Sequence, residues 1–137
     1  MLCPTRIRDM YMKQMDIVEE IKQICGNAII LNNGWYHFVY KRRHFVFIPD
    51  KKNKMIRITI PYVANGSEYN SKITESAVNE TNREIKYVKA QLLKNGNISL
   101  NYDHMICNDT SPCRIVRHII LTLYVASEYL TNKLELK

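Results

Sequence analysis

Two histidines and two cysteines in the last third of the chain are the side chains best suited to hold a metal ion. His104 and Cys107 are separated by two residues, and Cys113 and His118 follow. Zinc sites combine thiolates and imidazoles, often as close Cys-x-x-Cys pairs. Here five residues separate the two cysteines, and Cys113 and His118 are five positions apart, so on a helix they do not share a face. We therefore predict no metal site.

Nucleophilic catalysis would require more than a cysteine. Cys25 or Cys107 would need a histidine base and an orienting group nearby, and no local signature supports such a set. The chain also lacks the Gly-x-x-x-x-Gly-Lys loop that cradles phosphates. We predict a protein that is not an enzyme, with no catalytic residues and no cofactor.

The net charge of +7 includes two short basic runs at expected turns: Lys41, Arg42 and Arg43, then Lys51, Lys52 and Lys54. Charged turns are commonly just solvated, but such runs can also contact an anionic partner. The alternative function is therefore weak, salt-sensitive nucleic-acid binding by a basic edge at 41–44 and 51–54, with Trp35 or Tyr36 stacking on bases. No recognised nucleic-acid motif supports it.

The elements that position these residues begin with a predicted helix over 16–25. Asp16 is the expected N-cap, Glu19 can reach back to it, and Gly26 provides a left-handed stop. Residues 1–15 could extend this helix backwards, since Ile7, Met10 and Tyr11 have helical spacing, or they could fold back on the domain or form a loosely attached extension.

The next part of the chain predicts strands. A short apolar run at 28–31 is followed by aromatic and β-branched runs at 35–40, 44–48 and 55–60. A two-residue turn within 41–43 would place one set of side chains on a common core face: Tyr36, Phe38, Tyr40, Phe45, Phe47, Ile56, Ile58 and Ile60.

The reverse face of these strands is not cleanly polar, since it carries Trp35, Val39, Val46 and Ile48. A half-solvated antiparallel sheet usually alternates apolar and polar residues. We expect a cover for this face, which is either a helix of the same chain or a second subunit or partner.

A second helix is predicted from Asn70-Ser71 to about residue 84, and a hairpin follows over 86–103. The apolar set of 86–92 (Val88, Ala90 and Leu92) and that of 97–103 (Ile98, Leu100 and Tyr102) are both even-numbered. A two-residue Asn-Gly turn would send the two strands' sets to opposite faces, whereas the three-residue loop Lys94-Asn95-Gly96 keeps them together. We predict the three-residue loop.

The last helix is predicted over 112–134, with Ser111 as N-cap and Pro112 in the first turn. Leu121, Tyr124 and Val125 fall on the face that should be wet, so this helix carries more apolar surface than one contact requires. Together with the reverse face of the sheet, these three residues form a predicted partner or dimer surface.

The order of elements is helix, three main strands, helix, two strands, long helix, which predicts a single α+β domain over 1–137 with helices packed on a twisted antiparallel sheet. Several stretches resemble the YbjN-like family, which is grouped with the type III secretion chaperone-like fold: "HFVFIPD" (44–50), "RITIPY" (57–62), "VNETNREIKYVKAQL" (78–92), "GNISLNYD" (96–103) and "ASEYL" (126–130). The resemblance covers about 16–134. It implies the same α+β fold and often a homodimer, and it implies no catalytic residue.

These observations favour a small protein-binding module that is chaperone-like or regulatory. We expect it to form a homodimer and to bind another protein as its partner. No segment is apolar for long enough to span a membrane. The N-terminal residues lack the apolar core of a signal peptide, so we expect a cytoplasmic location.

Overall fold

The computed structural model describes residues 14–107 and 111–135. The elements are α1 (Gln14–Cys25), β1 (Ile29–Ile30), β2 (Tyr36–Tyr40), β3 (Arg43–Ile48), β4 (Met55–Asn65), the 3-10 turn η2 (Gly66–Glu68), α2 (Ser71–Glu84), β5 (Val88–Leu92), β6 (Asn97–Met105) and α3 (Pro112–Glu135). This is the predicted α+β order. The expected folding back of 1–15 lies almost entirely outside the described residues.

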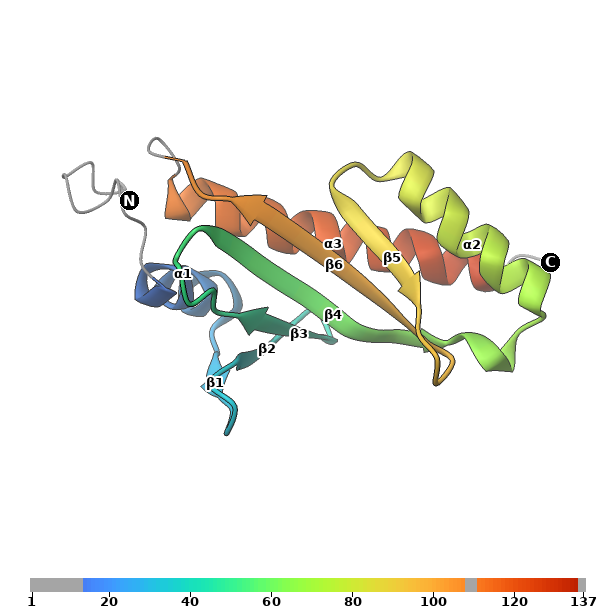
Figure 1. The fold of residues 1–137 in the computed structure, drawn as a ribbon, viewed down its shortest axis with the longest axis horizontal. Helices are drawn as coiled ribbons and strands as arrows, with labels where there is room; N and C mark the ends of the chain where they lie inside the picture. Colours follow the sequence, from blue (N-terminus) through green and yellow to red (C-terminus); the bar gives the residue numbers. More distant parts are fainter. Residues whose placement is uncertain (1–13, 108–110, 136–137) are drawn as a thin grey trace.

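The six strands form one antiparallel sheet in the order β1-β2-β3-β4-β6-β5. The hairpin β5–β6 joins the sheet through β6, which pairs with β4, so β1 and β5 are the two outer strands (Figure 1). The long strands β4 and β6 hold the two halves of the sheet together, with partners from Met55↔Met105 to Asn65↔Asn97.

Both predicted turns have the expected length. Tyr40 pairs with Arg43 across a two-residue turn in which Lys41 and Arg42 have φ of 48° and 71°. In the second hairpin Leu92 pairs with Ile98, so the three-residue loop is confirmed. Gly96 within it has φ of 91°, a backbone region that costs little only for glycine.

The core face of the sheet is the predicted one: it carries even-numbered residues of β2 and odd-numbered residues of β3, which pair across the two-residue turn. Phe38, Phe45 and Phe47 are fully buried there, while Tyr36 and Tyr40 are half-buried at its margin. The remaining strands add buried side chains to the same cluster: Ile56, Ile58, Ile60, Val88, Ala90, Ile98, Leu100 and Tyr102. Helix α3 supplies the opposing layer: Val116, Ile119, Ile120, Leu123, Ala126, Leu130 and Leu134.

All three helices belong to this one layer. Helix α3 runs behind β4, β5 and β6 in Figure 1, with α1 against one end and α2 against the other. The buried face of α1 (Ile17, Val18 and Ile21) joins the same core cluster. The other face of the sheet is therefore not covered by any helix within 14–107 and 111–135. None of the described helices is long and apolar enough to cross a membrane.

Local signals placed most helix ends correctly. Asn70 caps α2 by accepting from the N–H of Lys72 at 2.8 Å, and Gly26 ends α1 with φ of 81°. The predicted N-cap at Asp16 is wrong, because α1 already includes Gln14, so Asp16 lies in its first turn. Acidic residues are favoured in a first turn as well as at the cap, which explains the offset.

Strand β4 is longer than predicted and continues to Asn65. Its pairing with β6 shifts between Ile60 and Ala64, where Pro61 interrupts the ladder. A proline lacks the N–H that a central strand donates, so a bulge is the position where a sheet tolerates it. The predicted strand therefore stopped before Pro61, whereas the observed strand continues beyond it to Asn65.

Candidate protein-binding surfaces

The face of the sheet that no helix within 14–107 and 111–135 covers, here called the open face, has two chemically different halves. One row of register partners crosses it as Ile29, His37, Val46, Thr59, Asn101 and Lys89. The half formed by β4, β6 and β5 is polar, as expected for a wet sheet. The half formed by β1, β2 and β3 is largely apolar, which is the half predicted to need a cover.

The apolar half presents its side chains to different degrees. Trp35 is 40% exposed, and Val39 and Ile48 are half-buried. Val46, which was also predicted as a contact residue, is only 9% exposed. His37 is the register partner of Val46, and the rings of His37 and His44 stack at 5.1 Å with Nε2 and Nδ1 2.9 Å apart. The surface is thus a shallow apolar floor bordered by a histidine pair.

The outer surface of α3 is a second, separate candidate. Leu121 is 40% and Val125 54% exposed, one turn apart on the side of α3 that faces away from the sheet. Tyr124 instead packs on its own chain: its ring meets that of Tyr40 at 5.8 Å, and the Lys41 ammonium lies 5.3 Å from its centroid.

The predicted partner surface therefore does not form one patch. The open-face residues and the α3 residues lie on opposite sides of the molecule, with the core layer between them (Figure 1). A single partner of ordinary size could engage one surface or the other, which allows the chain two distinct contacts.

Near each edge of the sheet, an asparagine side chain binds the backbone N–H and carbonyl of one strand residue, Val39 of β2 or Ala90 of the outer strand β5. Asn27 donates to the carbonyl of Val39 at 3.2 Å and accepts from its N–H at 3.0 Å. Asn82, on α2, donates to the carbonyl of Ala90 at 3.1 Å and accepts from its N–H at 2.6 Å. Each amide thus substitutes for one residue of a neighbouring strand.

The closure matters because edge strands otherwise recruit other chains. Ala90 is the middle residue of β5, so an added strand would have to displace Asn82. At the opposite edge, the carbonyl of Trp35 accepts from Leu31, His37 pairs with Ile29, and β1 is only two residues long. We missed both closures from the sequence, since an asparagine near a strand carries no periodic signal.

The two basic runs lie at opposite ends of β3, so they do not form one edge. In the first run Arg43 is bound to Glu128 of α3 at 2.9 Å and to Thr131 at 3.1 Å, with its side chain 20% exposed. Lys41 lies over the rings of Tyr40 and Tyr124. These contacts hold the first run against α3 and leave the second run as the more available cationic site.

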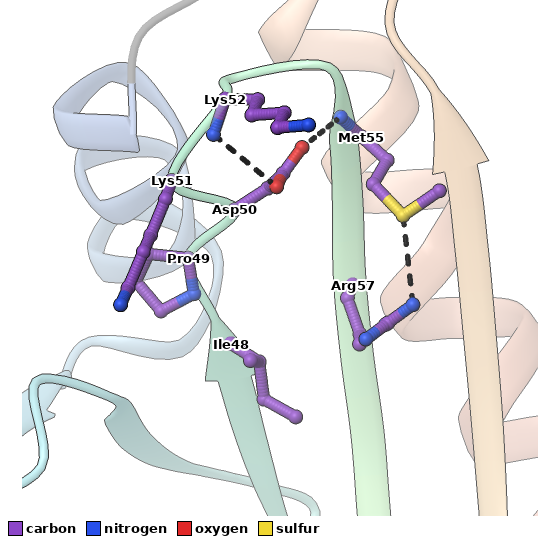
Figure 2. A pocket seen from close by; sticks show the side chains of 7 residues that line it. All are labelled: Ile48, Pro49, Asp50, Lys51, Lys52, Met55 and Arg57. Carbon is purple, nitrogen blue, oxygen red and sulfur yellow. Dashed lines mark hydrogen bonds between the residues drawn. The ribbon is translucent and has the colours of Figure 1, made fainter.

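The second run forms part of a pocket of about 300 Å³ on the open face, between the ends of β3 and β4. Figure 2 shows the pocket with Asp50, Lys51 and Lys52 on the turn and Ile48 and Arg57 on the two strands. The Asp50 carboxylate accepts from the N–H of Lys54 at 2.8 Å. The backbone N–H groups of Lys54, Lys52 and Met55 hold the pKa of this carboxyl below its ordinary value.

The His and Cys residues considered for a metal do meet in part. His104, Cys107 and His118 line one cavity of about 430 Å³ at the end of β6, beside Tyr87 and Tyr102. Among the described residues, however, no group of three or more His, Cys, Asp or Glu side chains is arranged to hold a metal ion. Burial lowers the pKa of His104, and nearby His118 lowers it further.

Cys25 is a poor candidate nucleophile. Burial raises the pKa of its thiol to about 11, whereas reactive cysteines have thiol pKa values lowered by positive surroundings. At neutral pH the side chain is therefore protonated, and it packs against the core cluster as a small apolar group.

Among solved structures, the fold is similar to the type III secretion chaperone SycH of Yersinia pestis, crystallised in complex with a stable fragment of YscM2. The TM-score is 0.54 at 15% sequence identity, covering 82% of this chain and 96% of that chain. No protein-family model and no curated protein matches the sequence. The comparison supports the secretion-chaperone-like fold, and it does not specifically support the YbjN-like family.

The closed edge at β5 yields a test. Replacing Asn82 with alanine should lower the free energy of unfolding by about 1–2 kcal/mol, because the Ala90 N–H and carbonyl lose their partners. It should also promote self-association at high concentration through the exposed edge. Denaturant unfolding and light scattering measure the two effects.

Asn79→Ala is the matched control, since Asn79 is an exposed asparagine on the same helix. It should change stability by less than about 0.5 kcal/mol, as surface substitutions usually do. Equal effects of the two variants would show that Asn82 does not close the edge.

Proposed function

We propose that this protein is a non-catalytic, chaperone-like or regulatory module that holds a segment of another protein on the apolar half of its open face. The observation that carries the proposal is a sheet with one partly apolar face that no described helix covers, and with edges that are blocked by Asn82 at β5 and short at β1. The partner would then bind across the face by side-chain contacts. The fold neighbour, a chaperone in complex with a protein fragment, supports protein binding as the class of function.

The energetics of such a contact are favourable but modest. Covering the exposed part of a large apolar side chain yields a fraction of the 1.5–3 kcal/mol that full burial gives, at roughly 25 cal/mol per Å². Trp35 and Ile29, which are 40% and 62% exposed, offer the largest gain on this half. Ordering a flexible segment opposes binding, so a micromolar rather than nanomolar affinity is expected.

We further propose a homodimer formed through the outer surface of α3. Leu121 and Val125 would pack on their copies across a two-fold axis, as an isologous interface requires. The open face is the poorer choice for self-contact, because two copies would bring Lys51, Lys52 and Arg57 near their own equivalents, and like charges across an interface are costly.

Three further proposals rest on the sequence alone. They are a single domain spanning 1–137, membership of the YbjN-like family, and a cytoplasmic location. Nucleic-acid binding is the second candidate. It is supported only by the second basic run, since Arg43 and Lys41 of the first run are engaged with α3 and the aromatic rings beside it.

Peptide binding tests the function. On an array of unstructured peptides of varied composition, the full chain should bind a subset that contains apolar residues. Trp35→Ser should weaken this binding about tenfold, because it removes a large exposed side chain that directly precedes β2 on that face. Leu93→Ser, an exposed apolar residue in the turn after β5, is the control. A chain that binds no peptide of any composition would refute the proposed function.

Light scattering tests the dimer. The full chain should show twice the mass of the 16.2 kDa chain at low micromolar concentration. Leu121→Glu should return it to the monomer with an unchanged far-UV spectrum, because two buried carboxylates would face each other. Gln91→Glu on the polar half of the open face should have no effect. If Trp35→Glu separates the subunits while Leu121→Glu does not, the dimer uses the open face and our assignment is wrong.

A further inference from the structure

The pocket between the ends of β3 and β4 combines an apolar floor with a cationic border. Ile48, Pro49 and Met55 form the apolar part of its lining, and Lys51, Lys52 and Arg57 supply the charges. Tyr36 pairs with Phe47, and continuing this register by one residue brings Trp35, which precedes Tyr36, opposite Ile48 of the pocket lining. The pocket is continuous with the apolar half of the open face.

The wall of the pocket is held in place without a ligand. Asp50 accepts from the N–H of Lys52 at 3.3 Å, of Lys54 at 2.8 Å and of Met55 at 3.0 Å, as Figure 2 shows in part. The carbonyl of Asp50 also accepts from Asn53 at 2.9 Å. A turn closed by four hydrogen bonds needs little further ordering on binding, which lowers the entropic cost.

The acidic groups near the pocket are already engaged. The Asp50 carboxylate is taken up by backbone N–H groups, and Asp103 is bound by the Nε of Arg57 at 2.9 Å. Arg57 still has donors to offer, because a guanidinium carries five N–H groups. Within the described residues neither Lys51 nor Lys52 forms an ion pair. Lys51, Lys52 and Arg57 carry three positive charges against the two negative charges of Asp50 and Asp103, so these described groups leave a net charge of +1 at the pocket.

We propose that this pocket receives an acidic side chain of the bound protein segment while adjacent apolar residues of the same segment lie on Trp35 and Ile48. This inference rests on the proposed function and specifies its partner as an acidic, apolar-containing segment. A bare phosphate backbone fits less well, since the cations border one pocket with an apolar floor and do not form a track.

The test compares short labelled peptides by fluorescence anisotropy with the full chain. One peptide alternates leucine and glutamate, one alternates leucine and lysine, and one contains glutamate with serine; a single-stranded DNA oligonucleotide completes the set. The leucine–glutamate peptide should bind best. The double variant Lys51→Gln/Lys52→Gln should weaken its binding about tenfold, since two cations at the contact are lost.

The matched control is Lys86→Gln/Lys94→Gln, which removes the same charge from exposed positions that flank β5, the outer strand at the opposite edge of the sheet. It should change the Kd by less than about twofold. An equal loss in both variants would overturn the pocket in favour of a diffuse charge effect. Equal binding of the serine–glutamate peptide would overturn the apolar contact, and tighter binding of DNA would replace the proposal with nucleic-acid recognition.

The outcomes also separate this inference from the function on which it rests. If the leucine–lysine peptide binds as tightly as its acidic counterpart, and the Lys51/Lys52 variant retains that affinity, the chain still binds peptides but the acidic preference is wrong. If none of the peptides binds, the proposed function fails with it.

Discussion

Packing of all three helices on one face of the sheet is the constraint on which the rest of the structure depends. The core-face side chains of five strands meet α3 and the buried faces of α1 and α2 in a single cluster. Helix α3 crosses β4, β5 and β6 on the core face, and α2 packs beside it on β5. No described helix is left for the opposite face, so the chemistry of that face is decided by strand residues that contact solvent or a partner.

The open face and the sheet edges differ in how many of their groups already have partners within the chain. Near the two edges, the side chain of Asn27 binds the backbone of Val39 in β2, and that of Asn82 binds the backbone of Ala90 in β5. The backbone therefore offers few free hydrogen-bonding groups to an incoming strand. The polar half of the open face is also self-sufficient, with Arg57 bound to Asp103. What remains exposed is the apolar surface around Trp35 and a group of cationic side chains beside it. This combination favours recognition through side chains over sheet extension.

Much of the fold followed from parity and turn chemistry. The even-numbered positions of 88–102 and the glycine at 96 were enough to fix the hairpin register, because a slip by one residue would expose a whole apolar set. The division of the candidate surface was not predictable in the same way. The pattern grouped Leu121 with Trp35 as excess apolar surface, whereas only the position of α3 places them on opposite sides. The asparagine contacts near the edges depend on one side-chain amide reaching the backbone of one residue, and the periodicity of apolar residues in the sequence does not predict such a contact.

Trp35 is the single tryptophan of the chain, so its fluorescence reports directly on the open face. Acrylamide quenching of the full protein tests most directly whether that face is uncovered. We predict efficient quenching in the free protein, the same quenching in the Leu121→Glu variant, and protection when the leucine–glutamate peptide is bound. A Trp35 shielded from acrylamide in the free Leu121→Glu monomer would contradict the account, because the chain would then cover its own open face.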